Sequence, residues 1–256
     1  MPAASLIPLR IAVTSDNICP FCFIGLRKLQ AALRTSPYTS GAEAVFAPQL
    51  HFLPYQLDPT LPKAQAVDKR ERYMRKFGPR FVQMESMMKE RGAEEGIHFD
   101  YDGPLRNTFD SHRLLSHAYA QGGWEAQLRL LEELFPHYFE RRGDPGSHEE
   151  LAKLATDAHL FPSVDAALSW LRGSEQAAEV TSGFERARSK GITGVPFFEL
   201  EAGEPEALRA VAEIPGAQDA QCFRAIIERM AGKAGVAHKE AQDLPEGARV
   251  CGGAKC

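Results

Sequence analysis

The chain has 256 residues, which is enough for one or two domains whose cores are stable without disulfide bonds. Hydrophobic residues make up 44% and charged residues 25% of it, so a largely disordered chain is excluded. The net charge is -4 and basic residues are interspersed among acidic ones, so no basic stripe is available for nucleic acid. No window approaches the roughly 18 apolar residues of a membrane helix, and residues 1–16 lack the features of a signal peptide, so we expect a cytoplasmic protein.

The first part of the chain has the pattern of a strand, a helix and a second strand. Residues 9–13 alternate apolar and polar side chains, which predicts a strand with one buried side and then a loop over residues 14–18. The helix is expected to begin at Cys19 and Pro20, since proline suits a first helical turn. Apolar residues recur on one stripe of this helix, at Cys22, Leu26, Leu29 and Leu33. Residues 50–53 predict the second strand, which completes a βαβ unit.

The middle of the chain, residues 58–171, shows mainly helical spacing. Pro79 divides one pair of predicted helices, and Gly122 with Gly123 closes another helix. Ser147 is the first residue of a capping box, which predicts a further helix start. We therefore expect this block to be an all-helical insertion.

Four more elements follow the helical block. A helix over residues 174–190 leads to strands near residues 197–200 and 208–213, and an amphipathic helix follows at residues 219–230. This order of elements predicts an α/β protein with a thioredoxin fold and a large all-helical insertion domain. We divide the chain into a thioredoxin-like domain, a helical insertion and a flexible C-terminal tail: residues 1–57 with 172–231, residues 58–171, and residues 232–256.

The five cysteines are Cys19 and Cys22 near the start, Cys222 alone, and Cys251 and Cys256 at the end. In a reducing compartment such close pairs are more often redox-active or metal-binding than structural. The thiolate is the nucleophile, yet only about 3% of an ordinary thiol is ionised at neutral pH. We expect the helix N-terminus and a hydrogen bond from the Cys22 thiol to lower the pKa of Cys19, so that Cys19 attacks and Cys22 resolves. The alternative is a pair of buried cysteines that only fill the core.

The run Cys-Pro-Phe-Cys-Phe-Ile-Gly lies within residues 14–25, and three distant segments accompany it, residues 107–114, 191–198 and 214–218. Together these segments resemble the DsbA-like thioredoxin-fold proteins, in particular the FrnE-like branch, which is related to the 2-hydroxychromene-2-carboxylate isomerases. The resemblance implies a protein-disulfide oxidoreductase or isomerase. It also implies that Cys19 is the attacking thiol and that the peptide bond before Pro196 is cis.

The resemblance further implies where the substrate binds, because in this family the backbone beside the cis proline pairs with the bound polypeptide. The implied contacts are Pro20, Phe21, Val195, Asn107 and Thr108. Asn107 and Thr108 also suit the start of a helix, where their side chains would cap it. The expected partners are polypeptides that carry disulfides or thiols, with glutathione as a further redox partner. No organic cofactor, metal or membrane is required.

Two positions of the motif distinguish related proteins. Glutathione-dependent isomerases and transferases of this superfamily carry Ser-Pro where this chain has Cys19 and Pro20, and they remain the alternative assignment. The periplasmic oxidants hold a histidine between the two cysteines, which favours the reduced form, whereas this chain has Phe21. We therefore expect a reduction potential between about -180 and -280 mV, in the range of isomerases and reductases.

The C-terminal pair, Cys251 and Cys256, would close a loop too short for a disulfide to stabilise the fold much. A flexible tail from Met230 to Cys251 spans about 25 Å, so it can reach Cys19. We expect a shuttle dithiol that exchanges with the first pair, since some FrnE-like proteins carry a similar C-terminal pair. The alternatives are two incidental thiols in a disordered tail and a zinc site of four thiolates.

Two further residues receive a structural and a functional interpretation. Cys222 is expected to be a core residue of the last helix. Asp16, three residues before Cys19, is expected either to relay protons to the dithiol or to cap the loop.

Overall fold

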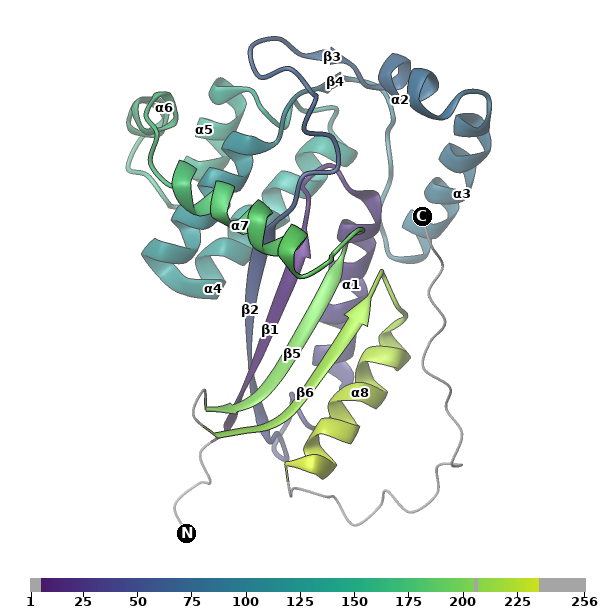
Figure 1. Cartoon of the computed structure of the whole chain (residues 1–256), viewed down its shortest axis with the longest axis vertical. Helices are drawn as coiled ribbons and strands as arrows, with labels where there is room; N and C mark the ends of the chain where they lie inside the picture. The colour runs from purple at the N-terminus through teal and green to yellow at the C-terminus, as the bar shows by residue number, and fades with distance from the viewer. Residues whose placement is uncertain (1–5, 205–206, 235–256) are drawn as a thin grey trace.

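A four-stranded sheet lies at the centre of the fold, which we describe from a computed structural model covering residues 6–204 and 207–234. Its strands are β1 (Ile7–Ser15), β2 (Phe46–Pro54), β5 (Phe197–Glu204) and β6 (Ala207–Pro215). They lie in the order β2-β1-β5-β6 (Figure 1). β1 and β2 are parallel, and the other neighbouring strands are antiparallel. This is the sheet of a thioredoxin fold, as predicted.

β1 runs through the middle of the sheet and ends beside the candidate site. The apolar residues that predicted this strand are buried: Leu9, Ile11 and Val13. The strand is longer than predicted, because Thr14 pairs with Leu53 on one side and with Phe197 on the other. The predicted loop over residues 14–18 therefore begins only at Asp16.

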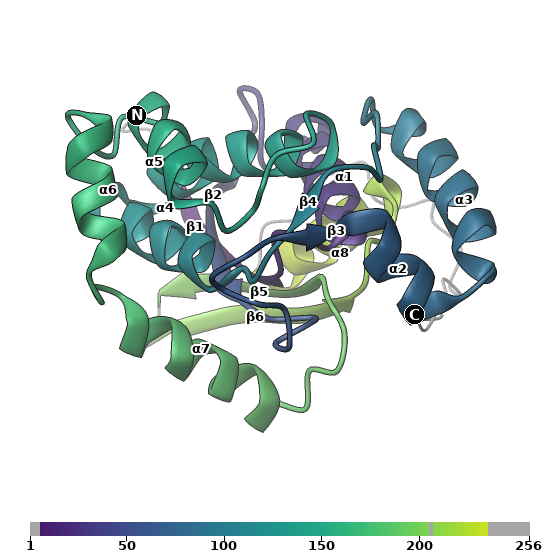
Figure 2. The ribbon, with the colours of Figure 1, turned by 90° about the horizontal axis from the view of Figure 1, so that it is seen from above.

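Helices cover both faces of the sheet (Figure 2). α1 (Pro20–Thr35) and α8 (Ala220–Lys233) pack against each other on one face, and α7 (Ala177–Ser189) lies on the opposite face. The predicted apolar stripe of α1 is buried at its first three positions, whereas Leu33 at its end is only half-buried. Burial of this stripe fixes which side of α1 faces the sheet.

The block between β2 and α7 is mainly helical, as predicted. Its helices are α2 (Lys69–Phe77), α3 (Arg80–Glu94), α4 (Phe109–Phe139), α5 (His148–Asp157) and α6 (Val164–Arg172). The block also contains a two-stranded sheet that we did not predict, formed by β3 (Val67–Asp68) and β4 (Pro104–Leu105). Strands of two residues are too short to show a periodic pattern. The division into separate domains at the stated residues stays a prediction.

The predicted helix boundaries in this block are found with two differences. Pro79 separates α2 from α3, and the Ser147 hydroxyl accepts the Glu150 N–H at 3.4 Å at the start of α5. The Glu150 carboxylate accepts a different backbone N–H, so only half of the predicted capping box forms. Gly122 and Gly123 leave the helical conformation, with φ of 65° at Gly123, but α4 resumes after them. The predicted end of a helix is therefore a kink.

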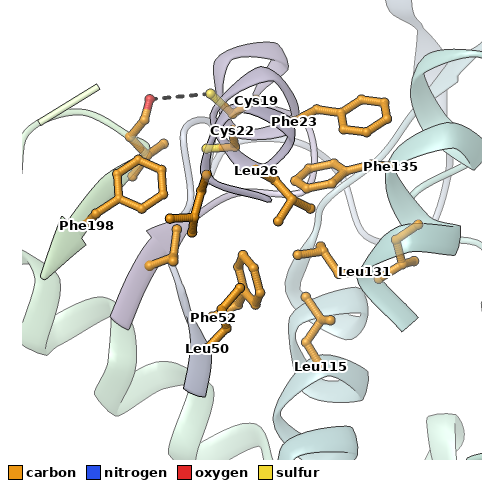
Figure 3. Close-up of a cluster of buried hydrophobic side chains, with 14 of the residues drawn as sticks. Cys19, Cys22, Phe23, Leu26, Leu50, Phe52, Leu115, Leu131, Phe135 and Phe198 are labelled. Carbon is orange, nitrogen blue, oxygen red and sulfur yellow. Dashed lines mark hydrogen bonds between the residues drawn. The ribbon is translucent and has the colours of Figure 1, made fainter. Parts of the chain in front are cut away.

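α4 covers the outer edge of β2. The buried Gln127 side chain accepts the Phe52 N–H at 2.8 Å and donates to the Phe52 carbonyl at 2.9 Å. These bonds satisfy backbone groups that an edge strand leaves unpaired. Phe23 of α1 stacks on Phe135 of α4 with ring centroids 5.0 Å apart, so one core continues from α1 to α4 (Figure 3).

Candidate active site

Cys19 occupies the N-cap position of α1 with an extended backbone (φ -90°, ψ 113°), and Pro20 is the first helical residue. The Cys19 Sγ–H donates to the Val195 carbonyl across 3.5 Å (Figure 3). The following peptide bond, between Val195 and Pro196, is cis, in agreement with the expectation. The Pro196 carbonyl accepts the Gly216 N–H at 2.8 Å, which ties this loop to the end of β6. The fold thus brings the first cysteine and the proline loop together.

Cys22 lies one helical turn after Cys19, and its N–H donates to the Cys19 carbonyl at 3.0 Å. Both cysteines are reduced, and each is only 3% exposed. The close approach of α1 to the proline loop requires Gly25, because a methyl group there would lie 3.0 Å from Pro196 Cγ. The two thiols and the loop are therefore held together by close packing of α1 on the start of β5.

The pKa of Cys19 differs from our expectation. Burial raises the pKa of its thiol well above the ordinary value, and the neighbouring Cys22 side chain raises it further. The Cys22 N–H lowers this pKa, while the charge of Asp16 adds a rise. The predicted lowering is therefore wrong for the reduced protein. The prediction took account only of the helix terminus and the second thiol. In the structure, segments that are distant in the sequence bury this sulfur.

Asp16 is completely buried between β1 and α1. Its Oδ2 accepts the Leu57 N–H at 2.8 Å, and its Oδ1 lies 3.3 Å from His112 Nε2 of α4. Its backbone carbonyl accepts the Cys19 N–H at 3.0 Å. The carboxylate therefore holds the loop that follows β2. We did not single out His112 from the sequence, although it lies in one of the segments that carried the family resemblance.

Asn107 and Thr108 precede α4 and take different parts in its start. The Asn107 side chain donates to the Leu61 carbonyl at 3.1 Å and accepts the Phe109 N–H at 3.0 Å, so it caps the helix. Thr108 occupies the N-cap position but makes no capping bond, and its buried hydroxyl has no hydrogen-bond partner within the described residues. The contact of either residue with a substrate stays a prediction.

A cavity of about 360 Å³ opens beside the dithiol motif. Its lining comes from α1, α3 and the loop before α8, and includes Phe21, Ile24, Lys28, Arg91, Glu94 and Asp219. The Arg91 guanidinium lies 5.8 Å from the centroid of the Phe21 ring. We did not predict the charged members of this lining, because they come from two helices and a loop that share no recognisable motif. Phe21 therefore borders a groove with both basic and acidic side chains.

The other cysteines add little to this site. Cys222 was expected in the core, but it is half-buried on α8. Cys251 and Cys256 lie outside the described residues, so the shuttle dithiol and the zinc alternative stay predictions. Within residues 6–204 and 207–234, no group of three or more His, Cys, Asp or Glu side chains is arranged to hold a metal ion. In the same part of the chain, no helix has the length and apolar character needed to cross a membrane.

We compared the chain with known protein families and solved structures, and both comparisons agree with the thioredoxin fold described above. The family described as "DSBA-like thioredoxin domain" matches residues 10–228. Among curated protein sequences, none matches the chain. The crystal structure of a probable DsbA oxidoreductase from Streptomyces coelicolor is similar, with a TM-score of 0.70 and 26% sequence identity. The likeness covers 95% of this chain and 96% of that one.

Two more distant structures show the same fold. The cytosolic disulfide reductase DsbM from Pseudomonas aeruginosa with GSH has a TM-score of 0.55 at 14% identity, over 87% of this chain and 99% of that one. A 2-hydroxychromene-2-carboxylate isomerase has a TM-score of 0.58 at 11% identity, over 90% of this chain and 100% of that one. At these identities the likeness concerns the fold alone.

Proposed function

The chain belongs to the DSBA-like thioredoxin domain family, and we propose that it is a thiol–disulfide oxidoreductase that acts on polypeptides through Cys19 and Cys22. The observation that carries the proposal is the 3.5 Å hydrogen bond from the Cys19 thiol to the Val195 carbonyl. A substrate whose backbone pairs with Val195 would hold its disulfide against this sulfur. Pro20 and Phe21 would flank the bound segment, and Pro196 would keep the loop in place.

The reaction needs two exchanges of thiol for disulfide. The Cys19 thiolate attacks one sulfur of the substrate disulfide, so a mixed disulfide forms and the other substrate sulfur leaves as a thiolate that takes up a proton. Cys22 then loses its proton and attacks the Cys19 sulfur, which releases the second substrate thiol. The substrate gains two electrons and two protons, and the protein is left with a disulfide between Cys19 and Cys22. A thiol reductant such as glutathione must then reduce this disulfide.

The environment of Cys19 favours reduction of substrates over oxidation. A strong oxidant of this fold owes its potential to a stabilised reduced form. Here burial raises the pKa of Cys19, and Phe21 offers no charge to the thiolate. We therefore propose a reduction potential between about -180 and -280 mV. Equilibration with glutathione buffers measures it, and a value near -120 mV would contradict the proposal.

Cys22 argues against the glutathione-dependent alternative. Because its N–H contacts the Cys19 carbonyl at 3.0 Å, the second thiol sits within one turn of the first. A mixed disulfide can then be resolved inside the protein, without glutathione as a co-substrate. The Pseudomonas aeruginosa disulfide reductase is described as cytosolic, and we propose the same compartment for this chain, where thiol reductants are abundant.

The decisive test is reduction of insulin disulfides, accompanied by refolding of scrambled ribonuclease to detect isomerase activity. Cys19→Ser should abolish insulin reduction, and Cys22→Ser should trap a mixed disulfide with the substrate. Cys222→Ser is the matched control, because Cys222 is a half-buried cysteine of α8 that lies outside the dithiol motif. Full activity of Cys19→Ser would overturn the assignment, and its loss together with that of Cys222→Ser would point to misfolding.

We also propose that Cys251 and Cys256 pass electrons to the first pair. The double variant Cys251→Ser/Cys256→Ser should turn over insulin more slowly, while alkylation of Cys19 stays unchanged. Turnover equal to that of the wild type would discard the shuttle and leave the assignment of Cys19 intact.

A further inference from the structure

One flank of α3 continues from the cavity beside the dithiol motif. Its residues follow one another at spacings of three or four, so they lie in one stripe, which we call the α3 flank: Met84, Met87, Arg91 and Glu94. All four are exposed, and the last two line the cavity together with Phe21. The residues that α3 buries form a separate stripe: Phe81, Glu85, Met88 and Gly92. The α3 flank therefore extends one wall of the cavity along the surface.

α3 runs beside α1 in the same direction. The Arg91 guanidinium lies 5.8 Å from the centroid of the Phe21 ring, and the Glu95 carboxylate lies 3.9 Å from the Lys28 ammonium. Along this contact, later residues of α3 thus lie beside later residues of α1. The part of α3 that precedes Arg91 then lies beyond Phe21, on the side of the N-terminus of α1, and Figure 1 shows α3 extending past that end.

Met84 and Met87 make this part of the α3 flank apolar. Their side chains are 36% and 37% exposed. Methionine is unbranched and flexible, so it adapts to apolar partners of different shapes. At about 1.5 Å per helical residue, Met84 lies about 10 Å from Arg91, which is the length of about three residues of an extended peptide. A polypeptide held at Cys19 would therefore place its next residues on these two methionines.

Arg91 adds a charge that has no partner in the protein. In the part of the chain that the structure describes, it makes no hydrogen bond and no ion pair. Of the two acids that line the cavity, Asp219 caps α8 by accepting the Cys222 N–H at 2.7 Å, and Glu94 lies on the far side of Arg91 from the methionines. The guanidinium thus lies between the dithiol motif and the apolar part of the flank, where an acidic side chain of a bound polypeptide would pair with it.

We propose that the α3 flank selects the polypeptide substrates of this protein. The selected segments carry an acidic residue within about two positions of the reactive cysteine and apolar residues beyond it, since about three extended residues cover the flank. Arg91 binds the acidic side chain, and Met87 with Met84 contacts the apolar ones. The inference rests on the proposed function, because it concerns segments whose disulfide reacts with Cys19. Glutathione has one residue on each side of its cysteine, so it is too short to extend from Cys19 past Arg91 to Met84.

Short peptides whose cysteine is joined to 2-nitro-5-thiobenzoate measure this selection. Cys19 attacks the peptide sulfur, so a disulfide between protein and peptide forms and the coloured thiolate leaves. The peptides carry aspartate, serine or lysine two positions from the cysteine and two leucines beyond it, on the N-terminal side in one set and on the C-terminal side in another. In one set, the wild type should react about fivefold faster with the aspartate peptide than with the lysine peptide, and Arg91→Glu should reverse this order. The rate of Cys19→Ser is subtracted as the contribution of the other thiols.

Two matched variants control for net charge and for changes on α3. Arg129→Glu makes the same change of charge at an exposed arginine of α4 outside the cavity lining, and it should keep the wild-type preference. Met87→Gln should slow the reaction with all leucine-bearing peptides of that set about threefold, because an apolar contact is lost. Val82→Thr changes a side chain that is 60% exposed on the opposite flank of α3, and it should leave these rates unchanged.

The outcomes distinguish this inference from the function itself. Exchange that depends on Cys19 but does not distinguish aspartate from lysine peptides, or a preference that Arg91→Glu leaves in place, would overturn the inference alone. Absence of Cys19-dependent exchange with every peptide would overturn the proposed function. Oxidised glutathione that responds to Arg91→Glu as strongly as the peptides do, with no effect of Met87→Gln on any substrate, would assign the flank to glutathione and overturn the inference. If Arg91→Glu fails to fold, Arg91→Gln replaces it and should abolish the preference.

Discussion

Gly25 offers a direct test of how the site is assembled. In α1, a methyl group at this position would lie 3.0 Å from Pro196 Cγ and 3.2 Å from Phe198 Cζ. Alanine improves helix propensity by about 1 kcal/mol over glycine, whereas overpacking of a core costs about 1 to 3 kcal/mol. Gly25→Ala should therefore lower the free energy of unfolding by up to about 2 kcal/mol. It should also slow insulin reduction, because the proline loop must move away from Cys19.

Urea denaturation and the insulin assay measure the two effects. Gly232→Ala is the matched control, since Gly232 is an exposed helical glycine of α8 and, within residues 6–204 and 207–234, no atom outside its own helix backbone and chain neighbours lies within 4 Å of the added methyl group. It should raise the free energy of unfolding by up to about 1 kcal/mol and leave activity unchanged. Equal stability and activity of Gly25→Ala and Gly232→Ala would refute the argument that close packing of α1 on the loop holds the site together.

Alkylation of Cys19 should speed up steadily from pH 7 to pH 9, because burial raises the pKa of its thiol; a plateau below pH 8 would contradict this. Burial lowers the pKa of Lys69 from 10.5 to about 8, so the folded protein loses this proton before the unfolded chain does, and stability rises with pH in between. Relative to Lys69→Met, the wild type should thus gain about 1 kcal/mol in its free energy of unfolding from pH 7.5 to pH 9 in urea titrations. A difference between the two proteins that stays constant with pH would argue against the pKa shift of Lys69. Gln127→Ala should cost about 2 to 4 kcal/mol in the same measurement, since the buried N–H and carbonyl of Phe52 lose their partner; the exposed Gln83→Ala should change it by less than about 0.5 kcal/mol.

The sheet, the helices around it and the dithiol were predictable because their signals are local. The alternation over residues 9–13 reflects one buried side of β1, and Pro20 marks a helix start that no tertiary contact needs to reveal. The strands predicted at residues 197–200 and 208–213 lie within β5 and β6, respectively. The pairing of segments into a thioredoxin sheet then follows from the order of elements alone.

The parts that were not predicted depend on residues far apart in the chain. Asp16 and His112 are 96 positions apart, and each by itself has the pattern of an ordinary polar residue near a helix. β3 and β4 are too short to show alternation. The Gln127 bonds satisfy the backbone groups of Phe52 at the edge of the sheet, and no periodicity in the sequence reveals this pairing.

The same distinction explains why the ionisation of Cys19 was misjudged. Sequence reasoning places the thiol at a helix N-terminus, a local effect of about one pKa unit in favour of the thiolate. Burial depends on the proline loop, 176 positions away, which contributes the Val195 carbonyl at 3.5 Å. A protonated thiol can donate to that carbonyl, whereas a thiolate cannot, so the contact itself favours the neutral form. A substrate that pairs with the Val195 backbone would compete for the same carbonyl, so binding would release the thiol from this bond as the disulfide arrives.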